Sequence, residues 1–247
     1  MSASPADTGA EVDVYRAVPK GEIKGGLIVI HEIWGLVDHI KDVADRFAAA
    51  GYVAYAPDIL SKARITPQAG KELSELISHP DEKVRVAAQP RFRELMAPAH
   101  DPAYGAWALE ALSTVVDDLA GQPGVDGRIG VVGYCFGGSY SFGLAATDAR
   151  IRAAVPYYGA PPEQVSVAKI NCPVLAIYGE DDDRLISGLP EVTKRLQDAG
   201  VDFTSKVYPD AGHAFFNDKS SNYRAEAAAD AWRLTLDFLA SNLGSIN

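Results

Sequence analysis

A glycine-flanked cysteine has the sequence context of a catalytic nucleophile. The segment Gly133–Gly138 has the sequence GYCFGG and places Cys135 in a G-x-C-x-G pattern, between an apolar run and a stretch of helical character. This pattern matches the nucleophile elbow G-x-S-x-G with sulfur in place of oxygen, and its glycines permit a sharp turn between strand and helix. Because the helix N-terminus that follows favours a thiolate over a thiol, we predict that Cys135 is a nucleophile.

A base and an acid follow Cys135 in the chain order that this turn requires. A free cysteine thiol has a pKa of about 8.5 and is mostly neutral at pH 7, so a nucleophilic cysteine needs a base or positive surroundings. The acidic run Glu180–Asp183 and the imidazole of His213 each come soon after a predicted strand. Parallel strands bring their carboxyl ends to one edge of a sheet, so we expect these groups to meet Cys135 there. His213 would act as the base, and a carboxylate would orient its ring.

Other residues of reactive type lack such a context. Cys172 precedes Pro173 at the start of a predicted strand, which favours an inert, buried thiol. His31 and Glu32 resemble the start of a zinc helix, but no second histidine follows four residues later. The run Glu180–Asp183 lacks the alternating spacing of a calcium loop. We therefore expect neither a metal ion nor an organic cofactor.

Short apolar runs predict a sheet. A β-branched run that follows Gly25 and Gly26 is typical of a strand buried on both faces. The predicted strands are Leu27–Ile30, Val53–Ala56, Ile129–Val132, Ala153–Tyr157, Val174–Tyr178 and Phe203–Tyr208, and Glu11–Val18 is predicted as an edge strand.

Helical segments separate these strands and predict an α/β fold, a mostly parallel central sheet with helices on both faces. One helix is predicted from Asp38, as its N-cap, to Gly51. The polar, proline-containing segment 61–102 is predicted to be an insertion over the sheet, with short helices around Lys71–Ile77 and Glu82–Ala88. We find no linker or internal repeat, so residues 1–247 are predicted to form a single domain.

Composition excludes several classes of partner. The 247-residue chain has a net charge of −10 and no cluster of basic residues, which argues against nucleic acid as a partner. No apolar run approaches the length of a membrane span. Met1–Gly9 lack the basic start and apolar core of a signal peptide, so a cytoplasmic protein is expected. A small-molecule substrate and a monomer or small homo-oligomer fit this composition.

The motifs together resemble those of the dienelactone hydrolase family, the carboxymethylenebutenolidases. The matching segments run in family order from about residue 10 to residue 240. They are HEIWG at His31–Gly35, HIKDVADRFAAAGYVAYAPDIL at His39–Leu60, GYCFGG at Gly133–Gly138, YGEDDDR at Tyr178–Arg184 and YPDAGHAFFND at Tyr208–Asp218. The resemblance implies an α/β-hydrolase fold and hydrolysis of a carboxylic ester or enol-lactone through a thioester.

The resemblance also implies roles for particular residues. Cys135, Asp182 and His213 would form the catalytic triad, with Asp183 as the alternative acid. Glu32 would help to hold and activate the thiol. The oxyanion hole would be formed by the backbone N–H groups of Ile33 and Phe136. Independently of the resemblance, the aromatic residues near these motifs suggest an apolar substrate pocket that includes Trp34, Tyr134 and Phe215.

One departure leaves the substrate open. Family members that act on dienelactones bind the substrate carboxylate with arginines, one of them shortly after the catalytic histidine, whereas His213 is followed by AFFN. Arg85, Arg91 and Arg93, within the variable segment, are the remaining candidates. A broad-specificity carboxylesterase, or a hydrolase of other activated esters, is therefore an alternative, and a non-catalytic thiol redox sensor is another.

Overall fold

The core of the protein is a seven-stranded sheet with the order β1-β3-β2-β4-β5-β6-β7. The computed structural model describes residues 12–163 and 165–244; Met1–Gly9 and Glu11, considered above, lie outside them. The strands are β1 (Val14–Ala17), β2 (Gly25–Ile30), β3 (Tyr52–Pro57), β4 (Ile129–Tyr134), β5 (Ile151–Tyr157), β6 (Val174–Gly179) and β7 (Phe203–Tyr208). All neighbouring pairs are parallel except β1 with β3, which confirms the mostly parallel sheet and the edge strand.

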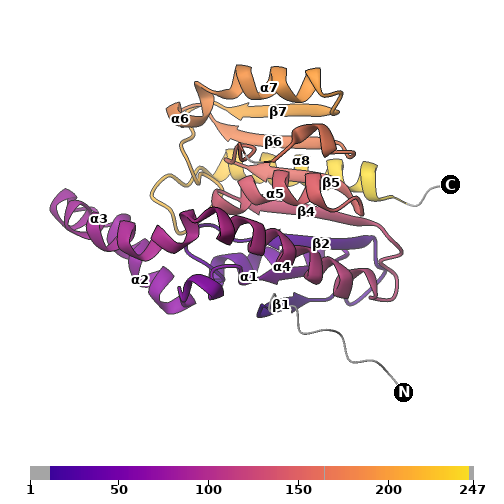
Figure 1. The fold of residues 1–247 in the computed structure, drawn as a ribbon, viewed down its shortest axis with the longest axis horizontal. Helices are drawn as coiled ribbons and strands as arrows, with labels where there is room; N and C mark the ends of the chain where they lie inside the picture. The colour runs from indigo at the N-terminus through magenta and orange to yellow at the C-terminus, as the bar shows by residue number, and fades with distance from the viewer. Residues whose placement is uncertain (1–11, 164, 245–247) are drawn as a thin grey trace.

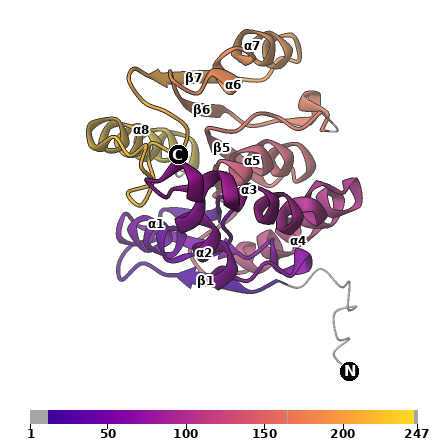
Figure 2. The same cartoon turned by 90° about the vertical axis from the view of Figure 1, so that its left-hand side faces the viewer.

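Helices cover both faces of the sheet, as predicted. Figure 2 shows α1 and α8 on one face and α4, α5 and α7 on the other. The α-helices are α1 (Asp38–Ala49), α2 (Pro67–Ile77), α3 (Glu82–Met96), α4 (Pro102–Ala120), α5 (Phe136–Thr147), α6 (Asp183–Ile186), α7 (Leu189–Asp198) and α8 (Ala225–Leu243), and the 3-10 helices are η1 (Ser61–Ala63), η2 (Ala97–His100) and η3 (Val167–Lys169). None of the helices formed by the described residues is long and apolar enough to cross a membrane.

Three helix boundaries differ from the sequence-based expectation. Helix α2 begins at Pro67, four residues before the predicted Lys71. Asp38 is the first residue of α1 rather than its N-cap. Val37 holds the N-cap position, and no side chain caps the helix there. Helix α3 continues eight residues beyond the predicted Ala88, although Pro90 lies inside it. Its mostly exposed residues give little apolar periodicity, which is why the pattern did not reveal its length.

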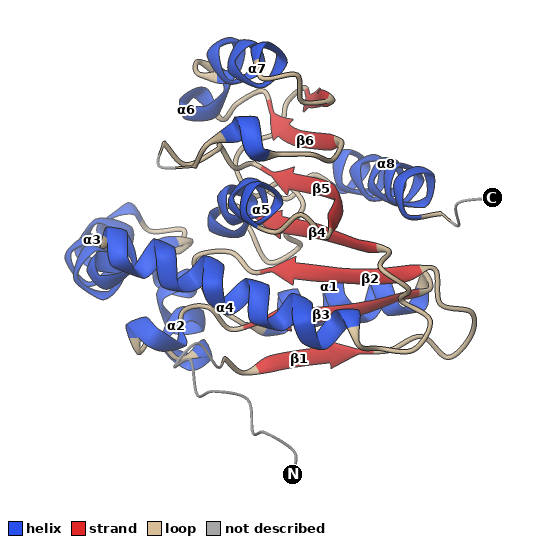
Figure 3. Cartoon of the chain, turned by 45° about the vertical axis from the view of Figure 1, so that its right-hand side comes forward, coloured by secondary structure: helices blue, strands red, loops and turns tan. Residues whose placement is uncertain are grey.

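Residues 61–102, the segment predicted as an insertion, form an arm beyond the carboxyl ends of the parallel strands. The arrowheads of β2, β4, β5 and β6 point toward the side on which α2 and α3 lie (Figures 1 and 3). The arm is anchored closely, because a Cβ atom at Gly70 would lie 1.9 Å from the carbonyl oxygen of Trp34. The Trp34 and Phe92 rings also pack at a centroid distance of 5.9 Å. The arm therefore lies against the loop that follows β2.

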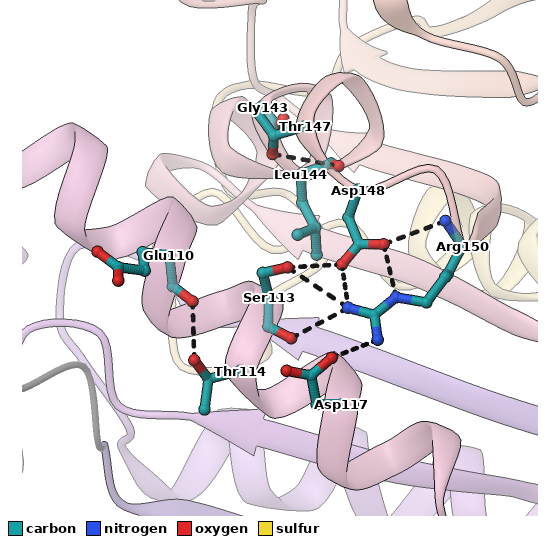
Figure 4. Close-up of polar contacts among 9 residues, drawn as sticks. All are labelled: Glu110, Ser113, Thr114, Asp117, Gly143, Leu144, Thr147, Asp148 and Arg150. Carbon is teal, nitrogen blue, oxygen red and sulfur yellow. Dashed lines mark hydrogen bonds and ion pairs between the residues drawn. The ribbon is translucent and has the colours of Figure 1, made fainter. Parts of the chain in front are cut away.

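A polar cluster around the buried Asp148 carboxylate fixes the C-terminal end of α5 to α4 (Figure 4). Arg150 donates from Nε to Asp148 Oδ1 at 2.8 Å and from Nη2 to Asp148 Oδ2 at 2.6 Å. Ser113 of α4 donates to the same carboxylate at 2.7 Å, and Arg150 also pairs with Asp117. Burial alone would raise the pKa of Asp148, but the hydrogen bonds from Arg150 and Ser113 lower it overall.

Replacing Asp148 with alanine is expected to lower the free energy of unfolding at pH 7 by about 2–3 kcal/mol, because Arg150 and Ser113 lose a charged, buried acceptor. Urea denaturation measures the change. Asp118→Ala is the control, since Asp118 pairs with Arg16 in an exposed ion pair, and its expected cost is below about 1 kcal/mol. Equal costs for the two variants would contradict the structural role of Asp148.

Candidate active site

The turn between β4 and α5 holds Cys135 in a strained conformation. Cys135 has φ 55° and ψ −110°, a region that residues with a side chain rarely adopt. The turn requires glycine on both sides, because an added Cβ would lie 2.1 Å from Gly137 O at Gly133 and 2.3 Å from Ile30 O at Gly137. These close approaches explain the two glycines of the pattern. The Cys135 side chain is half-buried at the carboxyl edge of the sheet.

Three side chains meet at this edge. His213 Nε2 lies 3.0 Å from Cys135 Sγ, and His213 Nδ1 lies 2.5 Å from Asp182 Oδ2. Because a carboxylate accepts but does not donate, Nδ1 carries the proton toward Asp182 and Nε2 faces the thiol. Asp182 is buried, whereas Asp183 is exposed and begins α6. The geometry thus brings Asp182 rather than Asp183 to the histidine.

The charges favour a protonated imidazole beside the thiol. Burial lowers the pKa of His213, but the hydrogen bonds to Asp182 and Cys135 and their negative charges outweigh it and raise the pKa to about 10. The imidazolium form is therefore present at neutral pH and is lost as the pH rises through about 10. An imidazolium at this position stabilises a thiolate and can supply a proton to a leaving group.

Backbone contacts hold the acid and base loops together. Glu180 N donates to Tyr208 O and Asp181 N donates to Ala211 O, each at 2.9 Å, so the loops after β6 and β7 are joined along their length. The Asn222 amide donates to His213 O at 2.8 Å. The position of the histidine is therefore set by the ends of two neighbouring strands rather than by a free loop.

The proposed oxyanion donors are available. Among the described residues, the backbone N–H groups of Ile33 and Phe136 donate to no other group. Phe136 begins α5, so its N–H points out of the positive end of a helix. The next amide in the helix, Gly137 N, donates to His31 O at 3.1 Å, which ties the loop after β2 to the start of α5. This contact holds Ile33 close to the turn at Cys135.

Glu32 lies in the same site but contacts different groups from those expected. Its Oε2 atom accepts a 2.6 Å hydrogen bond from Asn217, and its buried Oε1 atom has no protein partner. Burial raises the pKa of Glu32 to about 7, although Asn217, the charge on His213 and the Tyr158 hydroxyl lower it in part. Tyr158 OH is close enough for this effect but completes no hydrogen bond of normal geometry. The hydrogen-bond partner of the Cys135 thiol is His213, so the expected support of the thiol by Glu32 stays a proposal.

Glu32→Gln is expected to stabilise the protein at high pH. The raised pKa means that the folded state holds the Glu32 proton more tightly than the unfolded state, so the wild type loses stability as the pH rises from about 4.5 to 7. The glutamine variant avoids this cost of about 3 kcal/mol at pH 8 and gains little at pH 4. Urea unfolding at both pH values measures the change in the free energy of unfolding. Glu110→Gln, on the exposed surface of α4, is the control. An equal effect of Glu32→Gln at both pH values would contradict the assignment.

Tyr158 and Asn217 were not predicted as site residues. Tyr158 directly follows β5, has φ 37°, and packs its ring 5.1 Å from that of His213. The rule used for His213, which looks for polar residues after a strand, would have found Tyr158. Asn217 had no such signal, because only the fold of the loop after His213 turns its amide toward Glu32.

Two residues expected in the substrate pocket lie in the core instead. Tyr134 is the last residue of β4, and its fully buried ring packs 4.7 Å from Tyr157. Phe215 is also fully buried, with its ring 5.3 Å from that of Tyr208. Both face inward because the strand end and the loop after His213 close over an aromatic cluster. Trp34 is half-buried under the arm.

The remaining candidates have other partners. Both ring nitrogens of His31 are used, Nδ1 toward Glu32 O and Nε2 toward Ile59 N. Burial raises the pKa of the Cys172 thiol to about 12, as expected of an inert cysteine. Arg85 donates to the carbonyl oxygens of His79 and Pro80, and Arg91 donates to Glu72, so both are engaged within the arm. Arg93 is exposed on α3.

Comparison with known proteins identifies the family. The model of the dienelactone hydrolase family matches residues 12–243. The chain belongs to this family. A family relative from Saccharolobus solfataricus, provisionally named carboxymethylenebutenolidase, is 32% identical over 252 residues, which cover 94% of each chain. A relative from Escherichia coli (strain K12) with the same provisional name is 30% identical over 244 residues, covering 93% of this chain and 82% of the relative.

A solved structure supports the same conclusion for the fold. The crystal structure of a protein from Klebsiella pneumoniae, provisionally described as a dienelactone hydrolase, matches with a TM-score of 0.76 and 28% identity. The match covers 92% of both chains. The resemblance seen in the sequence and the α/β-hydrolase fold that it implied are therefore confirmed.

Proposed function

We propose that the protein hydrolyses a carboxylic ester or lactone with a Cys135–His213–Asp182 triad. The observation that carries the proposal is the continuous contact from Sγ to Nε2 at 3.0 Å and from Nδ1 to Asp182 at 2.5 Å. A thiol, an imidazole and a carboxylate in this arrangement can perform nucleophilic catalysis of acyl transfer. The family of the chain, whose named relatives are carboxymethylenebutenolidases and dienelactone hydrolases, supports an ester-bond substrate.

In the proposed first half-reaction, the Cys135 thiolate attacks the ester carbonyl carbon. The carbonyl oxygen takes up the negative charge of the tetrahedral intermediate and is stabilised by the N–H groups of Ile33 and Phe136. As the C–O bond breaks, His213 gives its Nε2 proton to the leaving alkoxide. The products are an alcohol and a thioester on Cys135.

In the second half-reaction, His213 takes a proton from water and the resulting hydroxide attacks the thioester. The same two N–H groups stabilise the second tetrahedral intermediate, and the thiolate leaves. Asp182 stays ionised throughout and stabilises the imidazolium. These steps use only groups of this chain and the attacking water.

A broad-specificity carboxylesterase is a second candidate, and one observation favours it. Asn217 lies four residues after His213 and donates a neutral amide to Glu32, where an arginine would offer a charge to an anionic substrate. Arg85 and Arg91 are bound within the arm. Of the three arginines considered as ligands of a substrate carboxylate, two are therefore engaged elsewhere, and Arg93, exposed on α3, is left.

The test compares hydrolysis of a neutral aryl ester, para-nitrophenyl acetate, with hydrolysis of cis- and trans-dienelactone. Cys135→Ala is expected to abolish measurable turnover of any substrate that the wild type accepts, whereas Cys172→Ala retains activity. Equal activity of wild type and Cys135→Ala would overturn the proposal. Preference for the neutral ester supports the carboxylesterase; preference for the dienelactones supports an anion-binding site.

A redox sensor would need the same thiol without turnover. Cys172 lies just before the amino end of β6, at the sheet edge opposite Cys135, and its thiol is buried. It is therefore poorly placed to resolve an oxidised Cys135 as a disulfide. Reactivity of Cys135 toward iodoacetamide with no activity on any ester would favour the sensor over the hydrolase.

A further inference from the structure

A groove runs along the outer surface of α5. It encloses a volume of about 610 Å³, within the usual range for small-molecule sites. One wall is formed by the first half of α4, and the other by the loop between β5 and β6 with η3. Its lining is mainly apolar, from residues such as Ala106, Leu109, Phe136, Tyr140, Pro162 and Val165.

The groove exists because small residues occur where the helices meet. Gly143 and Ala146 of α5 and Gly105 of α4 line it. A Cβ atom at Gly143 would lie 2.8 Å from Leu109 Cδ2, so a larger residue there would press on the wall. A helix that is apolar on all sides is normally buried, whereas this face of α5 stays partly accessible at Phe136, Ser139 and Tyr140. The open apolar face indicates a place for an apolar ligand.

One end of the groove is lined by the residue that directly follows the proposed nucleophile. Phe136, which lines the groove, directly follows Cys135 and carries a proposed oxyanion donor. Ser139 also lines the groove, and its N–H donates to Cys135 O at 3.2 Å. From Phe136 to Thr147 the helix advances about 16 Å, which is the approximate length of the groove. The groove therefore begins at the residue that follows Cys135 in the chain and leads away from it along α5.

The chemistry decides which part of an ester would occupy the groove. The leaving alkoxide must face His213 to receive its proton, and His213 approaches from the β7 side of the sheet. Helix α4, which forms one wall, packs over β2 and β3 on the opposite side of β4. The acyl group, which stays on Cys135, is thus directed away from the histidine and toward α4 and α5.

We propose that this groove binds the acyl chain of the substrate, and that the protein prefers esters of unbranched, medium-length carboxylic acids. The inference rests on the proposed function of Cys135 and adds a substrate class to it. The polar side chains in the lining, including those of Asp101, Thr147 and Lys169, are exposed to solvent and need not be desolvated by the chain.

The experiment measures kcat/KM for para-nitrophenyl acetate, hexanoate and decanoate below the concentrations at which the esters aggregate. Full burial of a methylene corresponds to about a fourfold gain, so partial burial along the groove predicts a decanoate-to-acetate ratio of at least about tenfold. Ala106→Trp, an exposed position on the α4 wall, is expected to lower that ratio about tenfold or more. Ala240→Trp, an exposed alanine of α8, is the matched control and should retain the wild-type ratio.

Binding without turnover separates the groove from the catalytic proposal. The non-hydrolysable para-nitrophenyl decyl ether is expected to bind wild type and Cys135→Ala alike and to bind Ala106→Trp about tenfold more weakly. A flat chain-length profile, or a decanoate preference that Ala106→Trp leaves intact, would overturn the groove proposal. Equal acetate hydrolysis by wild type and Cys135→Ala would instead overturn the triad, and the ether would still test the groove.

Discussion

Asp182→Asn is expected to lower kcat/KM for any accepted ester by about 10⁴-fold at pH 7, with little change in the fold. Asparagine keeps the shape of the side chain but removes the charge that raises the pKa of His213 and holds the Nδ1 proton. The corresponding change in a serine triad has an effect of this size, because the imidazole takes the wrong tautomer. Steady-state kinetics from pH 6 to pH 10 measure the loss.

Asp183→Asn provides the matched control for this prediction. Asp183 is adjacent in sequence, is exposed, and begins the short helix α6 rather than contacting His213. Its replacement is expected to change kcat/KM by less than about threefold, in line with the small effects of most surface substitutions. A larger loss in Asp183→Asn than in Asp182→Asn would contradict the assignment of the acid.

Gly137→Ala is expected to lower the free energy of unfolding strongly and to abolish activity as well. The added methyl group would lie 2.3 Å from Ile30 O and 2.6 Å from His31 O, which are backbone atoms that cannot move independently. Separating α5 from the end of β2 is expected to cost about 3 kcal/mol or more in free energy of unfolding. Because Ile33 lies in the loop that follows β2, the substitution would also displace a proposed oxyanion donor.

Gly105→Ala distinguishes this clash from a general effect of alanine. Gly105 is also helical, but its added Cβ would lie at an ordinary 3.8 Å from the Tyr140 hydroxyl. Since alanine is favoured over glycine inside a helix, this variant is expected to gain about 0.5–1 kcal/mol. Urea unfolding of the two variants should therefore shift in opposite directions. A stable, active Gly137→Ala would contradict the close packing of the turn.

The sequence predicted most of the sheet because its inner strands are short, fully buried apolar runs, several of them next to glycine or proline. Each predicted strand lies within a strand of the structure or overlaps it, as Ile129–Val132 lies within β4. The family resemblance placed Cys135, Asp182 and His213 together, and the structure brings them to one edge. The division into one domain with an insertion near 61–102 stays a prediction.

What the sequence did not reveal depends on three-dimensional packing. The inward direction of Tyr134 and Phe215 follows from how the aromatic cluster closes, and aromatic residue type alone does not distinguish a pocket wall from a core. The contact between Asn217 and Glu32 joins residues 185 positions apart. The groove along α5 depends on which glycines and alanines of two helices face each other, a relation that no local pattern records.

The central claim is that acyl groups pass through the sulfur of Cys135. Acid quenching of the reaction with para-nitrophenyl acetate within the first turnovers, followed by mass spectrometry of the digested protein, tests it most directly. We predict an acetyl group on the peptide that contains Cys135, absent from Cys135→Ala and longer-lived at low pH. Hydrolysis at the wild-type rate with the acetyl group on another residue, or in Cys135→Ala, would contradict the account.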